Sequence, residues 1–342
     1  MSNDSVLKIG LIGCGYWGPN YARVFHLMPL VKVVACSDLD HEKLSKLSHQ
    51  FPAIAQTSNY LDLLADTQVD AVVVSTQATT HFEIVKKCLQ AGRHVLVEKP
   101  LTMHVEQGKE LIDLAAKKKK VLMVGHTFLY NSAVRKMKEC VDRGILGKIY
   151  YLQAIRTHLG LIRKDVNAIW DLAPHDVSIF SYLLGRRPLE VCAVGGAYLK
   201  EGMEDVAFIN LLYPDGVLGN IHISWVDSNK VRQVAVIGSQ ARIVFDDLNN
   251  LEKVRIYEKG ISIDRPYDSF GEFQLLLRDG DIISPKLELY EPLRKVCEEF
   301  ADGILNQKPI LADGANGLEV VRVMEAIENS IKHRGAPTAV RG

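Results

Sequence analysis

The sequence has no surplus of charge, no closely paired cysteines and no long apolar segment. Its 41 Lys and Arg residues balance its 41 Asp and Glu residues, so no long-range field favours nucleic acid or an anionic membrane. The six cysteines are scattered without a C-x-x-C pair, which argues against a disulfide framework or a zinc site. We therefore expect a cytoplasmic protein that binds neither nucleic acid nor membrane and holds no metal.

Targeting signals are also missing. The stretch from Met1 to Ser5 is polar and lacks the charged and apolar regions of a signal peptide. No apolar run reaches the roughly 20 residues of a membrane-spanning helix. The one cationic cluster, Lys117 to Lys120, ends a helical pattern, where cations complement the helix dipole. It is interpreted as a solvated helix end rather than a binding patch.

A glycine turn near the start of the chain, Gly13-Cys14-Gly15-Tyr16-Trp17-Gly18, separates an apolar run from a segment that can be helical. The order and the G-x-G-x-x-G spacing match the dinucleotide fingerprint. Gly13 permits the tight turn, Gly15 lets the backbone approach a pyrophosphate, and Gly18 lets helix and strand pack closely. Unpaired N–H groups at the helix start then face the phosphate charge. The turn therefore predicts a dinucleotide site.

Apolar runs alternate with helical patterns through the first 125 residues. The strand-like runs are 7–12, 31–37, 71–75, 94–97 and 121–124, and the helical patterns are 19–26, 41–49, 58–64, 81–90 and 105–116. Strands without polar alternation belong to parallel sheets covered on both faces. The alternation predicts an α/β Rossmann domain with a doubly wound sheet, whose ligands bind at the carboxyl ends of the strands.

Several polar residues follow these strands and are therefore expected at the cofactor. Asp38 can bond the ribose hydroxyls and repel a 2′-phosphate, which favours NAD over NADP; its alternative role is a helix N-cap. Pro100 leaves the isomer of the Lys99–Pro100 peptide open. The residues expected at the cofactor are Gly13, Gly15, Tyr16, Trp17, Gly18, Asp38, Ser75, Thr76, Gln77, His81, Glu98, Lys99 and His126. A structural role is the alternative for His81.

The pattern changes after Gly125. The runs 149–156, 191–197, 206–213, 217–225, 232–237 and 242–246 alternate apolar and polar residues, with Pro214-Asp215-Gly216 as a turn. This predicts an α+β domain with a large, open, mostly antiparallel sheet, followed by helices over 291–304 and 317–333. We expect two domains, 1–125 for NAD binding and 126–342 for substrate binding and oligomerisation, and a homodimer or homotetramer.

A polar stretch in the second domain carries the candidate substrate residues. Pro174 suits the first turn of a helix over 177–184, and four residues separate Asp171 from His175. If a helical turn begins at Asp171, its carboxylate can orient the His175 imidazole. An N-cap aspartate and a structural histidine are the alternative.

At this point the sequence resembles the Gfo/Idh/MocA oxidoreductases. The resemblance covers essentially the whole chain and depends on the Gly13 fingerprint, Glu98-Lys99-Pro100, Gly125-His126 and the Asp171-to-His175 spacing. It implies hydride transfer between NAD(P) and a sugar or cyclitol carbon, with Lys99, Asp171 and His175 as catalytic residues. The chain departs from the family pattern at Gln77 and Ser132, where proline is common.

The stretch from Arg156 to Asp176 is similar to that of family members that act on nucleotide-linked sugars, in particular UDP-N-acetylglucosamine 3-dehydrogenases. These make a 3-keto sugar for a partner aminotransferase. We expect His175 to be the base and Lys99 to stabilise negative charge on the substrate oxygen, although Lys99 could itself be the base. The residues expected at the substrate are Lys99, Arg156, Arg163, Trp170 and His175, with the two arginines as a pyrophosphate clamp or as exposed charges.

Other functions stay open. A free-sugar or inositol dehydrogenase would use the same groups, and a 3-ketosugar reductase would use them in reverse. An NAD-binding sensor or regulatory protein is the non-enzyme alternative. The presence of Lys99, Asp171 and His175 in one chain argues against the sensor.

Overall fold

The computed structural model describes residues 6–160, 162–261 and 277–342 and divides the chain into two compact units. The first unit comprises residues 1–130 and 290–321, and the second comprises 131–289 and 322–342. The first boundary lies five residues beyond the predicted 125/126 division. The predicted second domain, 126–342, differs from the second unit in that the chain returns to the first unit over residues 290–321.

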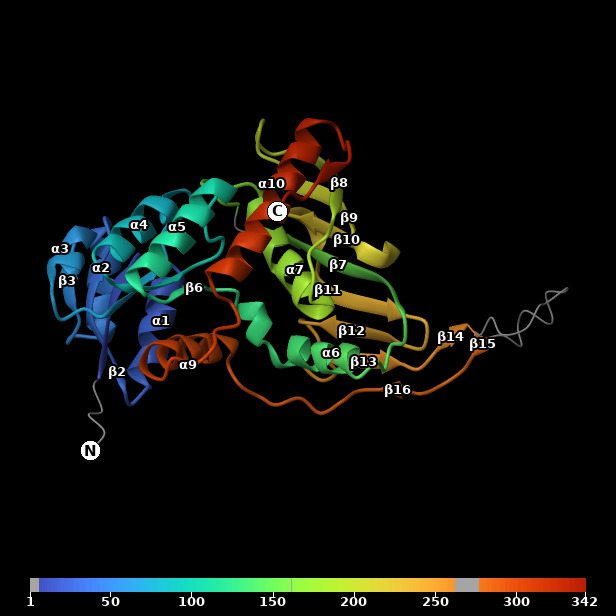
Figure 1. Cartoon of the computed structure of the whole chain (residues 1–342), viewed down its shortest axis with the longest axis horizontal. Coiled ribbons are helices and arrows are strands. Elements are labelled where there is room, and N and C mark those ends of the chain that lie inside the picture. Colours follow the sequence, from blue (N-terminus) through green and yellow to red (C-terminus); the bar gives the residue numbers. More distant parts are fainter. Residues whose placement is uncertain (1–5, 161, 262–276) are drawn as a thin grey trace, which may run out of the picture. The chain divides into compact units, whose positions relative to one another are not determined.

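The first unit contains a six-stranded parallel sheet in the order β3-β2-β1-β4-β5-β6 (Figure 1). Its strands are β1 (Leu7–Ile12), β2 (Val31–Ser37), β3 (Ala55–Thr57), β4 (Ala71–Val74), β5 (His94–Val97) and β6 (Leu122–Val124). β4 and the last three residues of β5 are buried, as expected for a sheet covered on both faces. This confirms the predicted Rossmann domain.

The crossover helices of this unit are α1 (Trp17–His26), α2 (His41–Gln50), α3 (Tyr60–Ala65), α4 (His81–Gln90) and α5 (Val105–Lys118), with a short 3₁₀ turn η1 (Ala78–Thr80) before α4. Asp40 caps α2 by accepting the N–H groups of Glu42 and Lys43, and Asn59 caps α3. No side chain caps α1. Right-handed crossovers place α1 and α4 on opposite faces of the sheet, because the strand order reverses between β1 and β4.

The chain returns to the first unit through contacts with α1 and with β6. The 3₁₀ turn η2 (Thr127–Tyr130) follows β6, and the returning helices are α9 (Pro292–Leu305) and α10 (Gly314–Lys332). Glu291, before α9, forms an ion pair with Arg23 of α1. The Val124 N–H donates to the carbonyl of Ala312 at 2.8 Å. The helical periodicity predicts these helices but says nothing about which sheet they cover.

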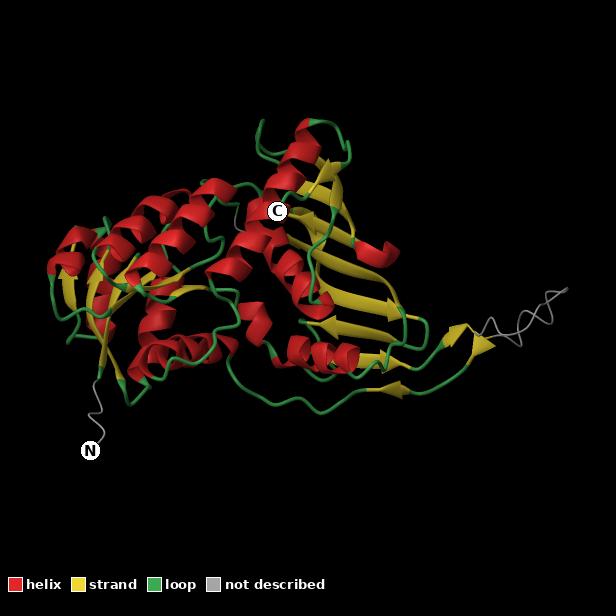
Figure 2. Cartoon of the chain, viewed as in Figure 1, coloured by secondary structure: helices red, strands yellow, loops and turns green. Residues whose placement is uncertain are grey.

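The second unit contains a nine-stranded sheet in the order β16-β13-β12-β11-β7-β10-β9-β8-β17 (Figure 2). Its strands are β7 (Ile149–Leu159), β8 (Glu190–Gly196), β9 (Val206–Leu212), β10 (Leu218–Ser224), β11 (Val226–Gly238), β12 (Arg242–Asp246), β13 (Val254–Tyr257), β16 (Ile282–Ile283) and β17 (Thr338–Ala339). The β7–β10 pair is parallel and the other pairs are antiparallel. A small separate pair, β14 (Gly260–Ile261) with β15 (Leu277–Arg278), completes the strands. The predicted mostly antiparallel sheet is confirmed.

Helices α6 (Ser132–Asp142) and α7 (Ala168–Leu184) belong to the same unit. α7 begins nine residues earlier than the predicted start at residue 177, because the side chain of Asn167 accepts the Trp170 N–H and caps the helix there. Pro174 therefore lies inside α7 rather than in its first turn, which corrects that prediction. Asp171 lies in the first turn instead.

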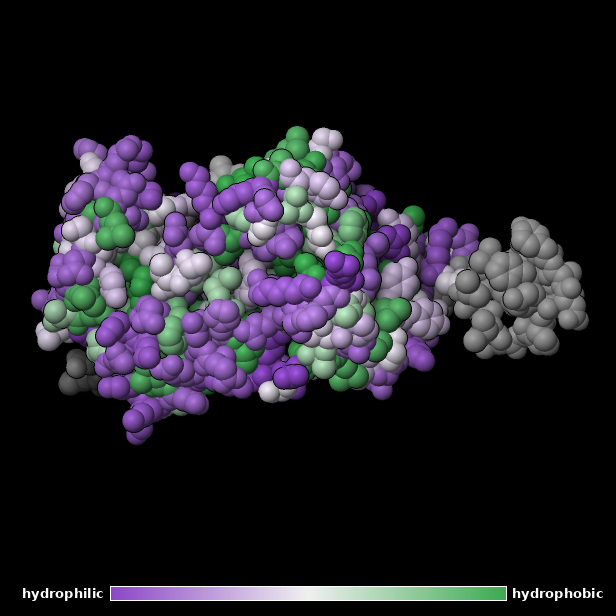
Figure 3. All heavy atoms as spheres, turned by 90° about the horizontal axis from the view of Figure 1, so that it is seen from above, coloured by the Kyte–Doolittle hydropathy of each residue, from purple (hydrophilic) through white to green (hydrophobic). Residues whose placement is uncertain are grey.

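Among residues 6–160, 162–261 and 277–342, no helix is long and apolar enough to cross a bilayer. On the face shown in Figure 3, hydrophilic residues alternate with several separate groups of hydrophobic ones.

Candidate active site

The glycine turn has the geometry that a bound pyrophosphate requires. Gly13 has φ +96°, and a Cβ there would lie 2.6 Å from the Ser75 carbonyl oxygen. A Cβ at Gly18 would lie 2.3 Å from the Gly13 oxygen, so helix and strand cannot pack with a larger residue. A Cβ at Gly15 would meet no protein atom within 4 Å. Protein packing therefore does not explain Gly15, whereas close approach of a ligand to the backbone does.

Asp38 and Ser75 form hydrogen bonds with the main chain of this turn. The Asp38 carboxylate accepts the Cys14 N–H at 2.7 Å and the Asp40 N–H at 2.9 Å. The Ser75 hydroxyl donates to the Gly13 carbonyl at 2.8 Å. Asp38 is partly exposed at the end of β2, so its orientation is fixed while part of the carboxylate stays open. Asp40, not Asp38, is the N-cap of α2, which removes the structural alternative for Asp38.

The other residues predicted at the cofactor lie around this edge of the sheet. Tyr16 is 80% exposed and precedes α1, and its ring packs edge-on against that of Trp17. Thr76 follows β4 and accepts a hydrogen bond from the Thr80 hydroxyl at 2.8 Å. Gln77 is exposed before η1. These residues surround the carboxyl ends of β1 and β4, where a doubly wound sheet binds its ligands.

Lys99 follows β5 at the same edge and is held through its main chain. Its N–H donates to the carboxylate of Glu98 at 3.2 Å. Glu98 is buried and accepts the Tyr21 hydroxyl at 2.7 Å. The Lys99–Pro100 peptide is cis. Glu98 therefore faces the protein interior rather than a cofactor, unlike its predicted role.

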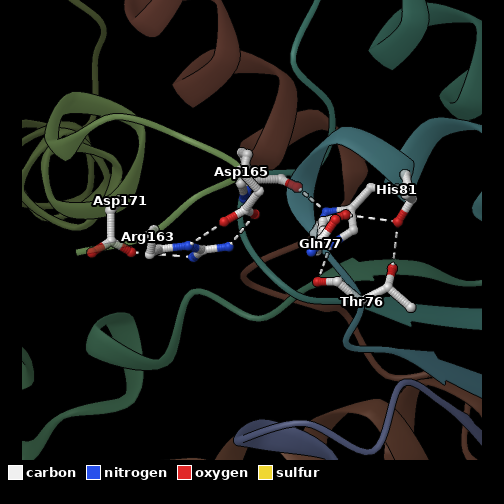
Figure 4. A network of polar contacts seen from close by, with 8 residues as sticks. Thr76, Gln77, His81, Arg163, Asp165 and Asp171 are labelled. Carbon is white, nitrogen blue, oxygen red and sulfur yellow. Dashed lines mark hydrogen bonds and ion pairs between the residues drawn. The ribbon is translucent and has the colours of Figure 1, made fainter. Parts of the chain in front are cut away.

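His81 faces backbone carbonyls. Its Nδ1 lies 2.7 Å from the Pro100 oxygen. Its Nε2 lies 3.3 Å from the oxygen of Thr76, which is labelled beside His81 in Figure 4. The side chain is 1% exposed. These contacts support the structural alternative for His81 over direct cofactor binding, because the ring is buried and both of its nitrogens face backbone carbonyls.

His126 follows β6 and is 1% exposed. Neither ring nitrogen has a hydrogen-bond partner among the described residues. Burial, with the positive charge of Lys99 as a smaller cause, lowers the pKa of His126 to about 3. The imidazole is therefore neutral near neutral pH and is covered by protein in this structure, which does not support the predicted direct contact with the cofactor.

In the second unit, Arg163 links two aspartates (Figure 4). Its Nε and Nη2 donate to the two carboxylate oxygens of Asp165 at 2.9 and 2.6 Å, and its Nη1 donates to Asp171 at 3.2 Å. An arginine engaged by two carboxylates is poorly suited to clamp an anionic pyrophosphate. The geometry therefore replaces the predicted clamp with a contact that holds Asp171.

Arg156 and Trp170 are structural. Arg156 is 4% exposed and forms a bidentate ion pair with Asp176, at 2.9 and 2.7 Å. Trp170 is 2% exposed, and its indole N–H donates to Glu328 at 2.7 Å. Neither side chain is placed for the predicted substrate contact. In both cases burial, which a polar motif does not reveal, decides the role.

His175 is half-buried on α7, one turn after Asp171. Residues four apart share one helix face, so the predicted pair has the required helical spacing. His158, which no sequence motif singles out, lies on the same face of β7 as Arg156. Burial and the positive charge of Arg232 lower the pKa of His158, while Asp171 opposes this shift. The alternation of side chains along β7 was the sequence signal that could have placed His158 beside Arg156.

No group of three or more His, Cys, Asp or Glu side chains suited to a metal is found among residues 6–160, 162–261 and 277–342. The chemically reactive side chains of the candidate site are one lysine, imidazoles and carboxylates. The first unit offers the glycine turn for a dinucleotide, and the second unit offers imidazoles that can accept a proton.

The glycine turn and the doubly wound parallel sheet have the geometry of a dinucleotide-binding Rossmann domain. Residues 7–126 match the model for the oxidoreductase family with an NAD-binding Rossmann fold, and residues 134–244 match the Gfo/Idh/MocA C-terminal domain. The chain belongs to the Gfo/Idh/MocA oxidoreductase family.

Two relatives and two solved structures illustrate the similarity. The chain is 27% identical to a myo-inositol 2-dehydrogenase of Thermotoga maritima, over 74% of this chain and 79% of the relative. It is 26% identical to the UDP-N-acetylglucosamine 3-dehydrogenase of Acidithiobacillus ferrooxidans, over 92% and 94%. A structure of that enzyme, GnnA, superposes with a TM-score of 0.81 at 25% identity, over 96% and 98% of the chains. GenD2 from gentamicin A biosynthesis, solved with NAD, shares the fold, with a TM-score of 0.83 at 24% identity over 99% and 97%.

Proposed function

We propose that the protein is an NAD-dependent dehydrogenase that removes hydride from a hydroxyl-bearing carbon of a nucleotide sugar, at C3 of UDP-N-acetylglucosamine. The single observation that carries a dehydrogenase is the Gly15 backbone, which is open to a ligand while protein atoms crowd Gly13 and Gly18. Similarity to a UDP-N-acetylglucosamine 3-dehydrogenase over 92% of the chain supports the substrate. The product is a 3-keto sugar, whose carbonyl an aminotransferase can aminate.

The reaction releases one hydride and one proton as CH–OH becomes C=O. NAD, when bound, accepts the hydride at its nicotinamide ring. His175 is assigned as the base for the hydroxyl proton, since an imidazole suits proton transfer near neutral pH. Asp171 orients this imidazole from the preceding helical turn, and Arg163 in turn holds Asp171 at 3.2 Å.

Lys99 is assigned to the substrate oxygen, where its ammonium group stabilises developing negative charge. The lysine is half-buried, and its positive charge contributes to the lowered pKa of His126. In the reverse, ketosugar-reducing direction the same group would polarise the carbonyl. Lys99 is the alternative base if His175 proves dispensable.

NAD is preferred to NADP because of Asp38. Its carboxylate is fixed by two main-chain N–H groups at the end of β2. A negative charge at this position bonds ribose hydroxyls and repels a 2′-phosphate. A ratio of NAD to NADP affinity above one tests this preference, and Asp38→Ser is expected to lower it.

A cyclitol or free sugar is the second candidate substrate, favoured by the 27% identity to a myo-inositol 2-dehydrogenase. The two candidates differ in the nucleotide. Activity with UDP-N-acetylglucosamine that disappears when the UDP group is removed supports the nucleotide sugar. Equal activity with N-acetylglucosamine or myo-inositol supports the alternative, and tight NAD binding without turnover of any sugar supports a sensor.

We further propose that a second copy of this chain covers the open face of the nine-stranded sheet, in a homodimer or homotetramer. Tyr151, Val194, Phe208 and Leu218 are each more than 40% exposed on neighbouring strands, and Phe208 stacks on His222. Such an apolar row is unfavourable in water. Light scattering that gives the mass of one chain would contradict this. The free thiols of all six cysteines support a cytoplasmic location.

A further inference from the structure

The main chain on either side of Lys99 is bonded by side chains from two helices that lie on opposite faces of the sheet. Tyr21 of α1 acts through Glu98, and His81 of α4 bonds Pro100 directly. We propose that Tyr21 and His81 are positioning residues that hold Lys99 in its reactive place. This inference rests on the proposed role of Lys99.

The first contact is a buried pair of hydrogen bonds through the Glu98 carboxylate, called the relay below. The Tyr21 hydroxyl donates to Glu98 Oε1 at 2.7 Å, and Glu98 Oε2 accepts the Lys99 N–H at 3.2 Å. Tyr21 is fully buried and Glu98 is 6% exposed. A Cβ at Gly125 would lie 3.0 Å from the Tyr21 oxygen and 3.2 Å from Glu98 Oε1. The relay therefore occupies the space that a side chain at Gly125 would need.

The Tyr21 phenol keeps its proton near neutral pH. Burial and the nearby Glu98 charge raise the pKa of the Tyr21 phenol, so the phenol remains a donor. Glu98 then accepts from the phenol and from the Lys99 main chain. Removing either donor leaves a buried carboxylate short of a hydrogen bond, which is unfavourable.

The second contact holds the main chain just after Lys99. His81 Nδ1 lies 2.7 Å from the carbonyl oxygen of Pro100, the residue after Lys99, and Nε2 lies 3.3 Å from that of Thr76 at the end of β4. A carbonyl can only accept, so the nitrogen at the shorter distance carries a proton. His81 thus donates from Nδ1 to Pro100.

Together the two contacts restrain the backbone immediately before and after the Lys99 side chain. A lysine side chain has many rotamers, so its ammonium group reaches a defined point only if its Cα is fixed. A displacement of about 1 Å at a reacting group can lower the rate by about 100-fold. The contacts are therefore expected to influence turnover more than cofactor affinity.

The chain offers a matched control for each positioning residue. His94 lies at the other end of β5, where its Nδ1 accepts the Val121 N–H at 3.0 Å. Tyr130 is 2% exposed and donates to Glu299 at 2.7 Å, a distance equal to that from Tyr21 to Glu98. His94→Leu and Tyr130→Phe therefore remove similar hydrogen bonds from the same unit without touching the Lys99 main chain.

The decisive measurements are turnover of UDP-N-acetylglucosamine, NAD affinity and local hydrogen exchange in the full-length protein. His81→Leu and Tyr21→Phe are expected to lower kcat by about 10- to 100-fold, with the NAD dissociation constant within about twofold of wild type. His81→Asn, which keeps a donor near Nδ1, is expected to recover most of kcat. The two control variants are expected to retain it.

Hydrogen exchange provides a readout that needs no substrate. The Lys99 amide is protected by Glu98, so a peptide that spans residues 96–102 is expected to exchange at least about 10-fold faster in His81→Leu and Tyr21→Phe. Peptides from β2 are expected to be unchanged. Unchanged exchange in residues 96–102 would overturn the positioning inference, whether or not the sugar is turned over.

The inference and the proposed function fail differently. If Lys99→Ala is inactive while His81→Leu and Tyr21→Phe have wild-type kcat, the positioning roles are wrong and the proposed function stands. If Lys99→Ala turns over UDP-N-acetylglucosamine like wild type, the proposed role of Lys99 is wrong. In that case, faster exchange in residues 96–102 of His81→Leu and Tyr21→Phe would show that the two residues restrain the backbone without contributing to turnover. That result would also overturn the inference.

Discussion

Arg163 holds the carboxylate of Asp171 at 3.2 Å while both carboxylate oxygens of Asp165 occupy the rest of its guanidinium. This contact connects the loop before α7 to the first turn of the helix, which carries Asp171 one turn before His175. It gives Arg163 a role through Asp171 in place of a direct role at the substrate. The two roles differ in the kinetic constant that they affect.

Arg163→Met is therefore expected to lower kcat by about 10- to 100-fold with KM for the nucleotide sugar changed less than about twofold, because Asp171 loses its restraint. Steady-state kinetics measure both constants. Lys164→Met, an exposed cation on the same loop, is the control and should behave as wild type. A large rise in KM with kcat unchanged would instead support the predicted pyrophosphate contact of Arg163.

Arg156 is expected to contribute to stability. Arg156→Met leaves the Asp176 carboxylate buried without its partner, so the free energy of unfolding should fall by about 3–5 kcal/mol. Arg232→Met is the control: it lies opposite Arg156 on β11, but its ion pair with Asp247 is 3.5 Å long and 37% exposed on the arginine side. That variant should lose no more than about 1 kcal/mol. Urea unfolding measures both, and equal losses would contradict the assignment.

The lowered pKa of His126 predicts loss of stability in acid. An unfolded histidine binds a proton below pH of about 6.5, whereas the folded one does so only near its pKa of about 3. Between these values the unfolded state holds more protons, so stability falls as pH falls. His126→Phe should reduce this slope in urea unfolding between pH 6.5 and about 4. An unchanged slope would show that His126 is not buried in neutral form.

Gly15 and Gly18 are expected to respond differently to alanine. Gly15→Ala places its Cβ in open space, so the melting temperature should change little while the NAD dissociation constant rises by at least about 10-fold. Gly18→Ala forces a contact with the Gly13 carbonyl and should lower the melting temperature itself. Calorimetric titration with NAD and thermal unfolding separate the two. Normal NAD affinity in Gly15→Ala would show that the dinucleotide does not bind at this turn.

Local pattern predicted much of the fold. Buried strands such as β4 are continuous apolar runs, and alternation in β9 predicts one covered face. β3 has only three residues and no apolar run, so the sequence does not single it out. The predicted start of α7 was wrong because Asn167 caps the helix, rather than a residue near Pro174. The return of α9 to the first unit depends on long-range contacts such as Arg23 with Glu291, which no local pattern encodes.

The candidate site could be predicted as a set of residues but not as a set of partners. Gly13, Gly15 and Asp38 have the geometry that their motif predicts. Arg156 and Arg163 were predicted as a clamp or as exposed charges. Instead, Asp176 engages Arg156 from 20 residues away, and Asp165 and Asp171 engage Arg163 from 2 and 8 residues away. Which charge neutralises which depends on tertiary packing, so a polar motif gives candidate ligands and structural ion pairs the same appearance.

The most direct test of the proposed function is the formation of reduced nicotinamide when wild-type protein and NAD are mixed with UDP-N-acetylglucosamine, with myo-inositol and N-acetylglucosamine in parallel. The account predicts reduction with the nucleotide sugar, a 3-keto product that an added aminotransferase can trap, and loss of most of the rate in His175→Ala with NAD binding retained. Reduction with myo-inositol alone, or a wild-type rate in His175→Ala, would contradict it.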